Sequence, residues 1–420
     1  MRGIFRALDN YNYRVWAAGA LCSNIGTWMQ RTAQDWLVLT ELTHRNARAM
    51  GVVVALQFAP QILLLPWTGF AADHLDRRKL LIATQAAMGL LALCLGLLTV
   101  TGLVALWHVY LFAFLLGCAA AFDMPARQTF VAELVGEADL SNAVALNSTS
   151  FNAARTIGPA VAGLLIAALG TGWVFLLNAA SFLAVLGSLG LLRTDAMHAT
   201  HRAARRRGSL AEGFRYVWGR PDLKAVLLML FLMGTFGFNF PIFISTMSVT
   251  VFRAGAGEYG FLSSVMAIGS VAGALLAARR SRPQVATLLA GIALFGLSCA
   301  LAAVMPDIWL FGVALAIVGV SAQTATTSAN SLVQLSTDPA MRGRVLAILL
   351  AIALGGMPIG APIVGWVADR FGPRWALGTA AAAGIAAALV GLRYLVAHRR
   401  LRVRFAAGRL RVSMDEVGVW

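Results

Sequence analysis

Charged side chains are scarce in this chain of 420 residues. Asp, Glu, Lys and Arg together make up 12% of it, whereas soluble domains average about 25%. Hydrophobic residues make up 59%, so most of the length is expected to lie in lipid rather than in water. A helix needs about 20 apolar residues to cross the hydrocarbon core of a bilayer, and the chain is long enough for a dozen such spans.

The residue patterns of redox, metal and nucleotide sites are also missing. The four cysteines each stand alone in an apolar run, and we interpret them as small packing residues: Cys22, Cys94, Cys118 and Cys299. The six histidines form no nucleophile–base or metal pattern, and no phosphate-binding loop with Gly-Lys-Ser/Thr occurs. We therefore expect neither an enzyme nor a bound metal or cofactor.

Basic residues outnumber acidic ones, 34 to 18, and their placement argues against a nucleic-acid ligand. When the N-terminus is placed inside, 27 basic residues fall in the N-terminus, the inner loops and the tail, and 5 fall in outer loops. This is the positive-inside bias of membrane proteins. It predicts twelve spanning helices with both termini in the cytoplasm. The lipid bilayer and a small molecule are the expected partners, and a monomer is the expected state.

The longest connection divides the chain near its middle. Residues 1–192 are predicted to form an N-terminal bundle of six helices, and residues 223–398 a C-terminal bundle of six. The linker between them, residues 193–222, is expected to be cytoplasmic, and its stretch 209–218 has the apolar face of an amphipathic interfacial helix. Residues 399–420 form a basic tail, which we expect on the inner membrane surface.

The two halves of the sequence resemble each other. Four residues recur 202 positions later: Gly158, Gly163, Gly170 and Trp173 return as Gly360, Gly365, Gly372 and Trp375. An offset of six helices keeps the copies in the same orientation, as in parallel repeats about an axis along the membrane normal. The predicted fold class is therefore an all-α integral membrane protein of two pseudo-symmetric six-helix bundles, with a substrate path between them.

Ionisable side chains lie deep in two of the apolar segments. Arg31 and Asp35 are one helical turn apart in the first segment, and Arg155 falls near the middle of the fifth. A lone charge at the bilayer centre costs about 2.5–3.5 kcal/mol on insertion scales, so such groups are kept where they are used. We interpret Asp35 as a proton carrier whose protonation releases a pairing with Arg31 or Arg155. The alternative is a permanent ion pair that fixes the first helix.

Polar and aromatic side chains at similar depth are candidates for the lining of a substrate path: Trp28, Gln34, Asn147, Asn152 and Asn239. A large apolar pocket with few polar groups suits bulky amphiphilic ligands. Packing between helices is the alternative role for each of these residues.

The loop after the second apolar segment, residues 69–79, reads GFAADHLDRRK. It resembles the signature loop between helices 2 and 3 of the major facilitator superfamily, where the cluster latches the two halves in one facing state. The resemblance implies a latch in which Asp123 is a further acidic partner of Arg77. Its members are Gly69, Asp73, Arg77, Arg78 and Asp123. Topology anchoring alone is the alternative role for the basic residues.

The fifth segment carries Gly158, Pro159 and Gly163. These residues are similar to the Gly-Pro element of drug:proton antiporters, which kinks the helix and packs it closely against a partner. The match is partial, because the earlier glycine of that element is Thr149 here. The alternative is that the small residues only allow helix packing.

Four more stretches resemble the branch of enterobactin exporters and macrolide efflux proteins: 28–37 (WMQRTAQDWL), 123–128 (DMPARQ), 140–147 (LSNAVALN) and 341–345 (MRGRV). The resemblance implies a secondary transporter in the bacterial cytoplasmic membrane that exports a drug- or siderophore-like amphiphile by alternating access. A proton gradient is the expected energy source, with sodium as a second option. Lysophospholipid flipping, as in a related branch, and a transport-inactive scaffold or sensor are the alternative functions.

Overall fold

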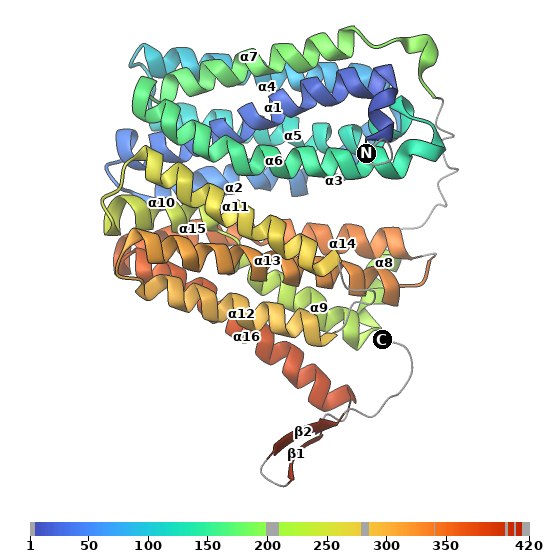
Figure 1. Ribbon diagram of the computed structural model, residues 1–420, viewed down its shortest axis with the longest axis vertical. Helices are drawn as coiled ribbons and strands as arrows, with labels where there is room; N and C mark the ends of the chain where they lie inside the picture. The colour runs from blue at the N-terminus through green and yellow to red at the C-terminus, as the bar shows by residue number, and fades with distance from the viewer. Residues whose placement is uncertain are drawn as a thin grey trace. The chain divides into compact units, whose positions relative to one another are not determined.

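Helices make up almost all of the computed structural model, which describes residues 5–198, 210–278, 285–339, 341–399, 402–406 and 409–413 (Figure 1). Within the described residues, ten helical segments are long and apolar enough to cross a membrane. Helix α1, which carries the ionisable side chains, is not among them, and α2, which α3 follows, is a shorter apolar helix. The predicted all-α membrane fold is thereby confirmed.

The elements of the first half of the sequence are η1 (Arg6–Asp9), α1 (Tyr11–Trp36), η2 (Leu37–Leu42), α2 (Ala47–Leu63), α3 (Leu65–His74), α4 (Arg77–Val100), α5 (Leu106–Leu134), α6 (Glu137–Leu169), α7 (Thr171–Gly190) and η3 (Thr194–Ala196). Those of the second half are α8 (Leu210–Trp218), α9 (Pro221–Leu232), η4 (Met233–Gly237), α10 (Phe240–Thr246), η5 (Met247–Val251), α11 (Ala256–Ala278), α12 (Val285–Val304), α13 (Ile308–Ser336), α14 (Arg342–Gly355), α15 (Met357–Phe371) and α16 (Pro373–Arg399), followed by strands β1 (Arg402–Ala406) and β2 (Arg409–Ser413).

Local sequence explains where several helices begin. Asn10, Asn46 and Asp76 each accept a hydrogen bond from a backbone N–H in the first turn of α1, α2 and α4, at 3.2, 2.9 and 3.0 Å. A side-chain oxygen at this position satisfies one of the N–H groups that the helix itself leaves without a partner.

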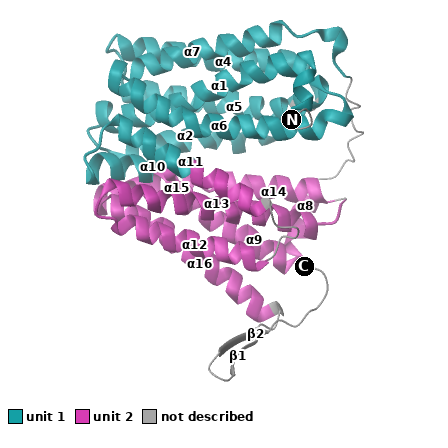
Figure 2. Ribbon diagram, in the orientation of Figure 1, with its two compact units in different colours: residues 1–206, 241–267 teal, residues 207–240, 268–420 magenta. Residues whose placement is uncertain are grey.

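Two compact units make up the chain (Figure 2). Unit 1 contains residues 1–206 and 241–267, and unit 2 contains residues 207–240 and 268–420. The division departs from the predicted boundary, because α10, η5 and the first half of α11 pack within unit 1. The hydroxyl of Ser264 in α11, for example, donates to the backbone carbonyl of Thr156 in α6 at 2.6 Å.

In unit 1, α1 packs against α6 and α7, α4 against α5 and α7, and α2 against α5. Large buried side chains fill the contacts around the start of α1 and the end of α5, among them Tyr13, Trp16 and Phe130. In unit 2, α12 packs against α13 and α16, and α9 against α16. Helix α8 lies at the stretch predicted to be amphipathic and is tied to α14 by an ion pair of Glu212 with Arg344 at 2.8 Å.

The repeat found in the sequence has a structural counterpart. Gly170 joins α6 to α7 and Gly372 joins α15 to α16, and both have a positive φ, of 88° and 100°. This backbone conformation is costly for residues with a Cβ. Each glycine therefore allows the same tight connection in its own half of the chain.

The last described residues form an antiparallel hairpin in which β1 pairs with β2, and Arg404 lies opposite Arg411. The hairpin falls within the basic tail, for which the sequence predicted no strands.

Candidate functional site

Asp35 lies near the end of α1 in a buried setting, 8% exposed. Its carboxylate accepts a hydrogen bond at 3.1 Å from the hydroxyl of Tyr259, which belongs to α11. The ring of Tyr259 stacks on Trp36, with ring centroids 6.0 Å apart and 23° between the planes. A hydrogen bond to the charged form stabilises a carboxylate, so this contact joins α1 and α11 through the one group that was predicted to carry a proton.

The hydrogen-bond partner of Asp35 is neither of the two arginines, although Arg31 lies within electrostatic range of the carboxylate. Within the described residues, neither Arg31 nor Arg155 comes within ion-pair distance of the carboxylate, and its hydrogen-bond partner is Tyr259. The guanidinium of Arg31 lies over the ring of Trp28 instead, 5.0 Å from the centroid. Long side chains on a helix point back toward its N-terminus, so Arg31 lies over the preceding turn rather than toward Asp35.

The position of Arg155 on α6 can be compared with the contacts between α6 and α1. Arg155 lies on α6 between Phe151 and Gly158, and both of these residues contact Trp28: the rings of Phe151 and Trp28 are 5.9 Å apart at 68°, and a Cβ at Gly158 would lie 2.5 Å from that of Trp28. Arg155 is four residues after Phe151 and three before Gly158, and residues so spaced share one face of a helix. Arg155 is therefore on the face of α6 that packs on α1.

Three of the predicted site residues have buried polar atoms without a hydrogen-bond partner in the described part of the chain: Gln34 Nε2, Arg155 Nε and Asn239 Oδ1. The first two belong to unit 1 and the third to unit 2. Leaving a buried donor or acceptor unsatisfied costs about 1–3 kcal/mol. A water, an ion or a ligand can complete the bonding of such atoms.

The remaining path candidates have less distinctive surroundings. Asn152 donates to the backbone carbonyl of Ser148 one turn earlier, at 2.8 Å, which is a local bond within α6. Asn147 is half-buried on the same helix. Asn239 uses its amide nitrogen on the carbonyl of Thr235, at 2.8 Å.

The Gly-Pro element brings three helices close together. Gly158 faces the backbone of α1, and a Cβ on Gly163 would lie 2.5 Å from the carbonyl oxygen of Ala256 in α11. Gly260 in turn faces the carbonyl of Pro159. Helix α6 continues through Pro159 from Glu137 to Leu169, and its small residues place it against α1 and α11 without an intervening side chain.

The predicted latch is organised differently from the expectation. Arg77, at the start of α4, forms an ion pair at 2.5 Å with Glu133, near the end of α5. Asp123 was expected as its partner, but ten residues separate Asp123 from Glu133 along α5, a rise of about 15 Å. Arg78 donates to the backbone carbonyl of Leu189 at 2.9 Å, and the side chain of Asp73 lies outside the described part of the structure.

Asp123 is instead the centre of a buried polar network that the sequence did not reveal. Its carboxylate accepts from Thr84 at 2.9 Å and Gln85 at 2.7 Å, both on α4. Arg127, one turn later on α5, pairs with it at 3.1 Å and also donates to Asn24 of α1 at 2.7 Å. The spacing of Asp123 and Arg127 is the one signal in the sequence that indicates this pair.

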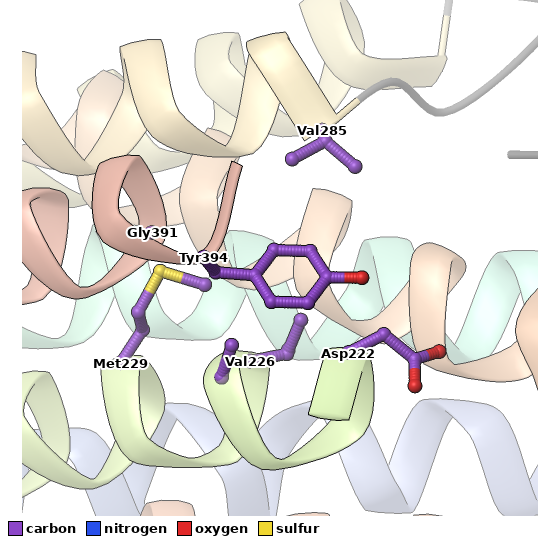
Figure 3. Close-up of a pocket in the computed structure, with 7 residues that line it drawn as sticks. Asp222, Val226, Met229, Val285, Gly391 and Tyr394 are labelled. Atoms are coloured by element: carbon purple, nitrogen blue, oxygen red, sulfur yellow. The ribbon is translucent and has the colours of Figure 1, made fainter. Parts of the chain in front are cut away.

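Unit 2 contains an apolar groove between α9 and α16 (Figure 3). It is lined by Asp222, Ala225, Val226, Met229, Val285, Gly391 and Tyr394. Asp222 is already bound by Arg220 at 2.5 Å, and its hydrogen bonds raise the pKa of that guanidinium. None of the predicted site residues lines this groove. Among the described residues, no cluster of three His, Cys, Asp or Glu could hold a metal ion.

Sequence comparison relates nearly the whole chain to known transporters. The family described as "Transmembrane secretion effector" matches residues 4–404. A multidrug efflux pump, Tap of Mycolicibacterium fortuitum, is 30% identical over 84% of this chain and 88% of its own. The staphyloferrin A transporter of Staphylococcus aureus is 25% identical over 90% of this chain and 94% of its own. The enterobactin exporter EntS of Shigella boydii is 27% identical over 86% of both chains.

Solved structures show the same fold at low sequence identity. A bacterial homologue of the human lysosomal transporter Spinster, in an inward-facing and occupied conformation, has a TM-score of 0.75 and 14% identity, covering 91% of this chain and 97% of its own. The nucleoside transporter NupG has a TM-score of 0.69 and 14% identity, and the match covers 92% of this chain and 99% of NupG.

Proposed function

Because this chain belongs to the transmembrane secretion effector family of the major facilitator superfamily, it is a secondary transporter, and we propose that it exports a small amphiphilic molecule in exchange for protons. The names of its relatives, two siderophore transporters and a multidrug efflux pump, support a substrate of the drug or siderophore class. The bacterial cytoplasmic membrane is the proposed location, with both termini inside because of the distribution of basic residues.

The observation that carries proton coupling is the hydrogen bond between Tyr259 and Asp35. This bond stabilises the ionised carboxylate, so forming it favours proton release and breaking it favours proton uptake. The two residues come from α1 and α11, which belong to different halves of the sequence and meet at the predicted outer side. We infer that a proton on Asp35 weakens this contact between the two helices, and that the contact in turn disfavours the proton.

In the proposed cycle, the contact forms when the outer side closes and breaks when it opens. Asp35 then takes up a proton from outside and releases it toward the cytoplasm once Tyr259 is bound again. The substrate moves outward in the other half of the cycle. The protein opens outward with substrate bound, and it returns to the inward-facing state with Asp35 protonated. The proton gradient is the proposed energy source, and a sodium gradient is the alternative.

The test is transport in proteoliposomes with an imposed pH gradient. Two fluorescent probes of similar size are used: dansylcadaverine, which ends in an amine, and 6-(dansylamino)hexanoate, which ends in a carboxylate. We expect gradient-driven movement of at least one of them, and its loss on adding a protonophore. Asp35→Asn keeps the side-chain size and removes the titratable charge, so gradient-driven movement should fall by more than tenfold.

Asn239→Ala is the matched control, because it alters a buried polar side chain that carries no charge. It is expected to retain dependence on the pH gradient, whatever its rate. Each variant is first shown to insert and to elute as a single species. Gradient-driven export by Asp35→Asn at the wild-type rate would exclude Asp35 as the proton carrier, and Asp123 would be examined next.

A further inference from the structure

The buried side-chain atoms without a hydrogen-bond partner in the described part of unit 1 are both donors. Among its described residues, the two buried atoms that lack a partner are Gln34 Nε2 and Arg155 Nε. The guanidinium of Arg31 is a third set of donors, and it lies over the ring of Trp28. Guanidinium groups donate and never accept, so the ligand that satisfies these groups has to supply acceptor oxygens.

The donors follow one another along α1 and α6. Arg31 is three residues after Trp28 and Gln34 is three residues after Arg31, so Arg31 is the neighbour of both on successive turns of α1. Phe151 packs on Trp28 from α6, and Arg155 lies one turn further on the same face of that helix. Each residue of the aromatic pair therefore has an arginine one turn further along its own helix, and the guanidinium of Arg31 lies over Trp28.

Positive charge at this surface exceeds negative charge. Asp35 lies within electrostatic range of Arg31, and its carboxylate is hydrogen-bonded by Tyr259, so one carboxylate stands against two guanidinium groups. Two guanidinium groups in a largely apolar setting are costly unless an anion pairs with them. Arginine also binds carboxylates through two parallel hydrogen bonds, which makes the pairing selective as well as strong.

We propose that Arg31, Gln34 and Arg155 bind an acidic, oxygen-rich group of the exported molecule, whose apolar or aromatic body lies on Trp28 and Phe151. The substrate class is thus an amphiphilic carboxylate or a related acid, in preference to an amphiphilic amine. This inference rests on the proposed export function for the existence of a substrate, and it assigns to the arginines a role in recognition rather than in holding Asp35.

The test is equilibrium binding of the two dansyl probes to the purified full chain in lipid nanodiscs, with empty nanodiscs as the background. The probes share the fluorophore and a five-carbon spacer and differ in the terminal group. We expect 6-(dansylamino)hexanoate to bind about tenfold more tightly than dansylcadaverine. Arg155→Gln should remove most of that preference, Arg155→Lys should keep part of it, and Arg31→Gln should weaken carboxylate binding.

Arg45→Gln is the matched control, since it removes the same charge from an exposed position of unit 1 and should leave both affinities unchanged. A preference for the amine probe, or carboxylate binding that is unaffected by both Arg31→Gln and Arg155→Gln, would overturn the inference even if the chain transports. Arginine-dependent carboxylate binding without transport driven by a pH gradient would instead support this site and contradict the proposed proton coupling.

Discussion

The contact between α1 and α6 in unit 1 has a counterpart in unit 2, where η4 meets α15. Gly158 lies against Trp28 and the backbone of α1, and Gly360, 202 residues later, lies against the backbone of Thr235 in η4. The close approach is therefore kept in both halves. The chemistry is not, because α1 carries Arg31 and Asp35 one and two turns beyond Trp28, whereas residues 225–252 contain no charged side chain.

This difference distinguishes two roles, close packing of helices and energy coupling, that the sequence pattern alone does not distinguish. A duplicated helix bundle needs small residues wherever its helices pack closely, so the glycines recur in both copies. A coupling group is needed once, because one protonation event can bias the equilibrium between two facing states. The glycines are accordingly expected to govern assembly, and the ionisable groups of unit 1 to govern energy coupling.

The largest expected effect comes from filling the close contacts. Gly360→Ala places a methyl group against the carbonyl oxygen of Thr235, and Gly158→Ala places one 2.5 Å from the Cβ of Trp28. Overpacking of this kind costs about 1–3 kcal/mol. Both variants should lower the midpoint of thermal unfolding in detergent, and Gly360→Ala should lower it more, because a backbone carbonyl cannot rotate away.

Gly187→Ala is the control for these variants, since a methyl group there meets no atom within 4 Å and alanine favours a helix. Its midpoint should equal or exceed that of the wild type. Equal midpoints for Gly360→Ala and Gly187→Ala would show that the repeated glycine does not close a tight contact.

An effect of comparable size is expected when the hydrogen-bond partner of Asp35 is removed. Tyr259→Phe keeps the ring that stacks on Trp36 and deletes the hydroxyl that binds the carboxylate. Hydrogen bonds to charged groups contribute about 1.5–3 kcal/mol. Gradient-driven transport should therefore fall, and its dependence on outside pH should shift, while the protein stays folded.

Tyr13→Phe is matched to that variant, because the Tyr13 hydroxyl also makes a buried hydrogen bond, at 2.8 Å to the carbonyl of Ala143. It should reduce thermal stability slightly and leave the pH profile in place. Identical pH profiles for Tyr259→Phe and the wild type would contradict the coupling role of Tyr259.

Sequence alone was sufficient for most of the fold, because the length and spacing of apolar runs and the placement of basic residues determine the spans. It also singled out Asp35 as a candidate site residue, since a carboxylate so deep in an apolar run is rare, and this stays a prediction. It could not find Tyr259, which is 224 residues away and lies in a helix without unusual spacing. The orientation of Arg31 over Trp28 was equally hidden, because helical spacing alone allowed a pairing with Asp35.

The latch shows a similar limit. The motif singled out Arg77 as a latch residue, which stays a prediction. The choice of its acidic partner on α5 depends on how far α4 and α5 overlap, which the sequence does not encode in any spacing. A resemblance suggested Asp123, and the structure places Glu133 against Arg77 and binds Asp123 to Arg127.

The smallest expected effect is the coupling between Arg77 and Glu133. Their side chains are 16% and 19% exposed, so solvent screens the pair in part, and its interaction energy should be about 0.5–1 kcal/mol. A double-mutant cycle of Arg77→Gln and Glu133→Gln, read by thermal stability, should show non-additivity of that size. The same cycle with Arg77→Gln and Asp123→Asn should be additive, because Asp123 is held by Thr84, Gln85 and Arg127. Non-additivity with Asp123 and additivity with Glu133 would restore the partner that the motif suggested. In transport assays, loss of the Arg77–Glu133 pair should change the rate more than the pH profile, since we propose that the pair biases the equilibrium between facing states and carries no transported proton.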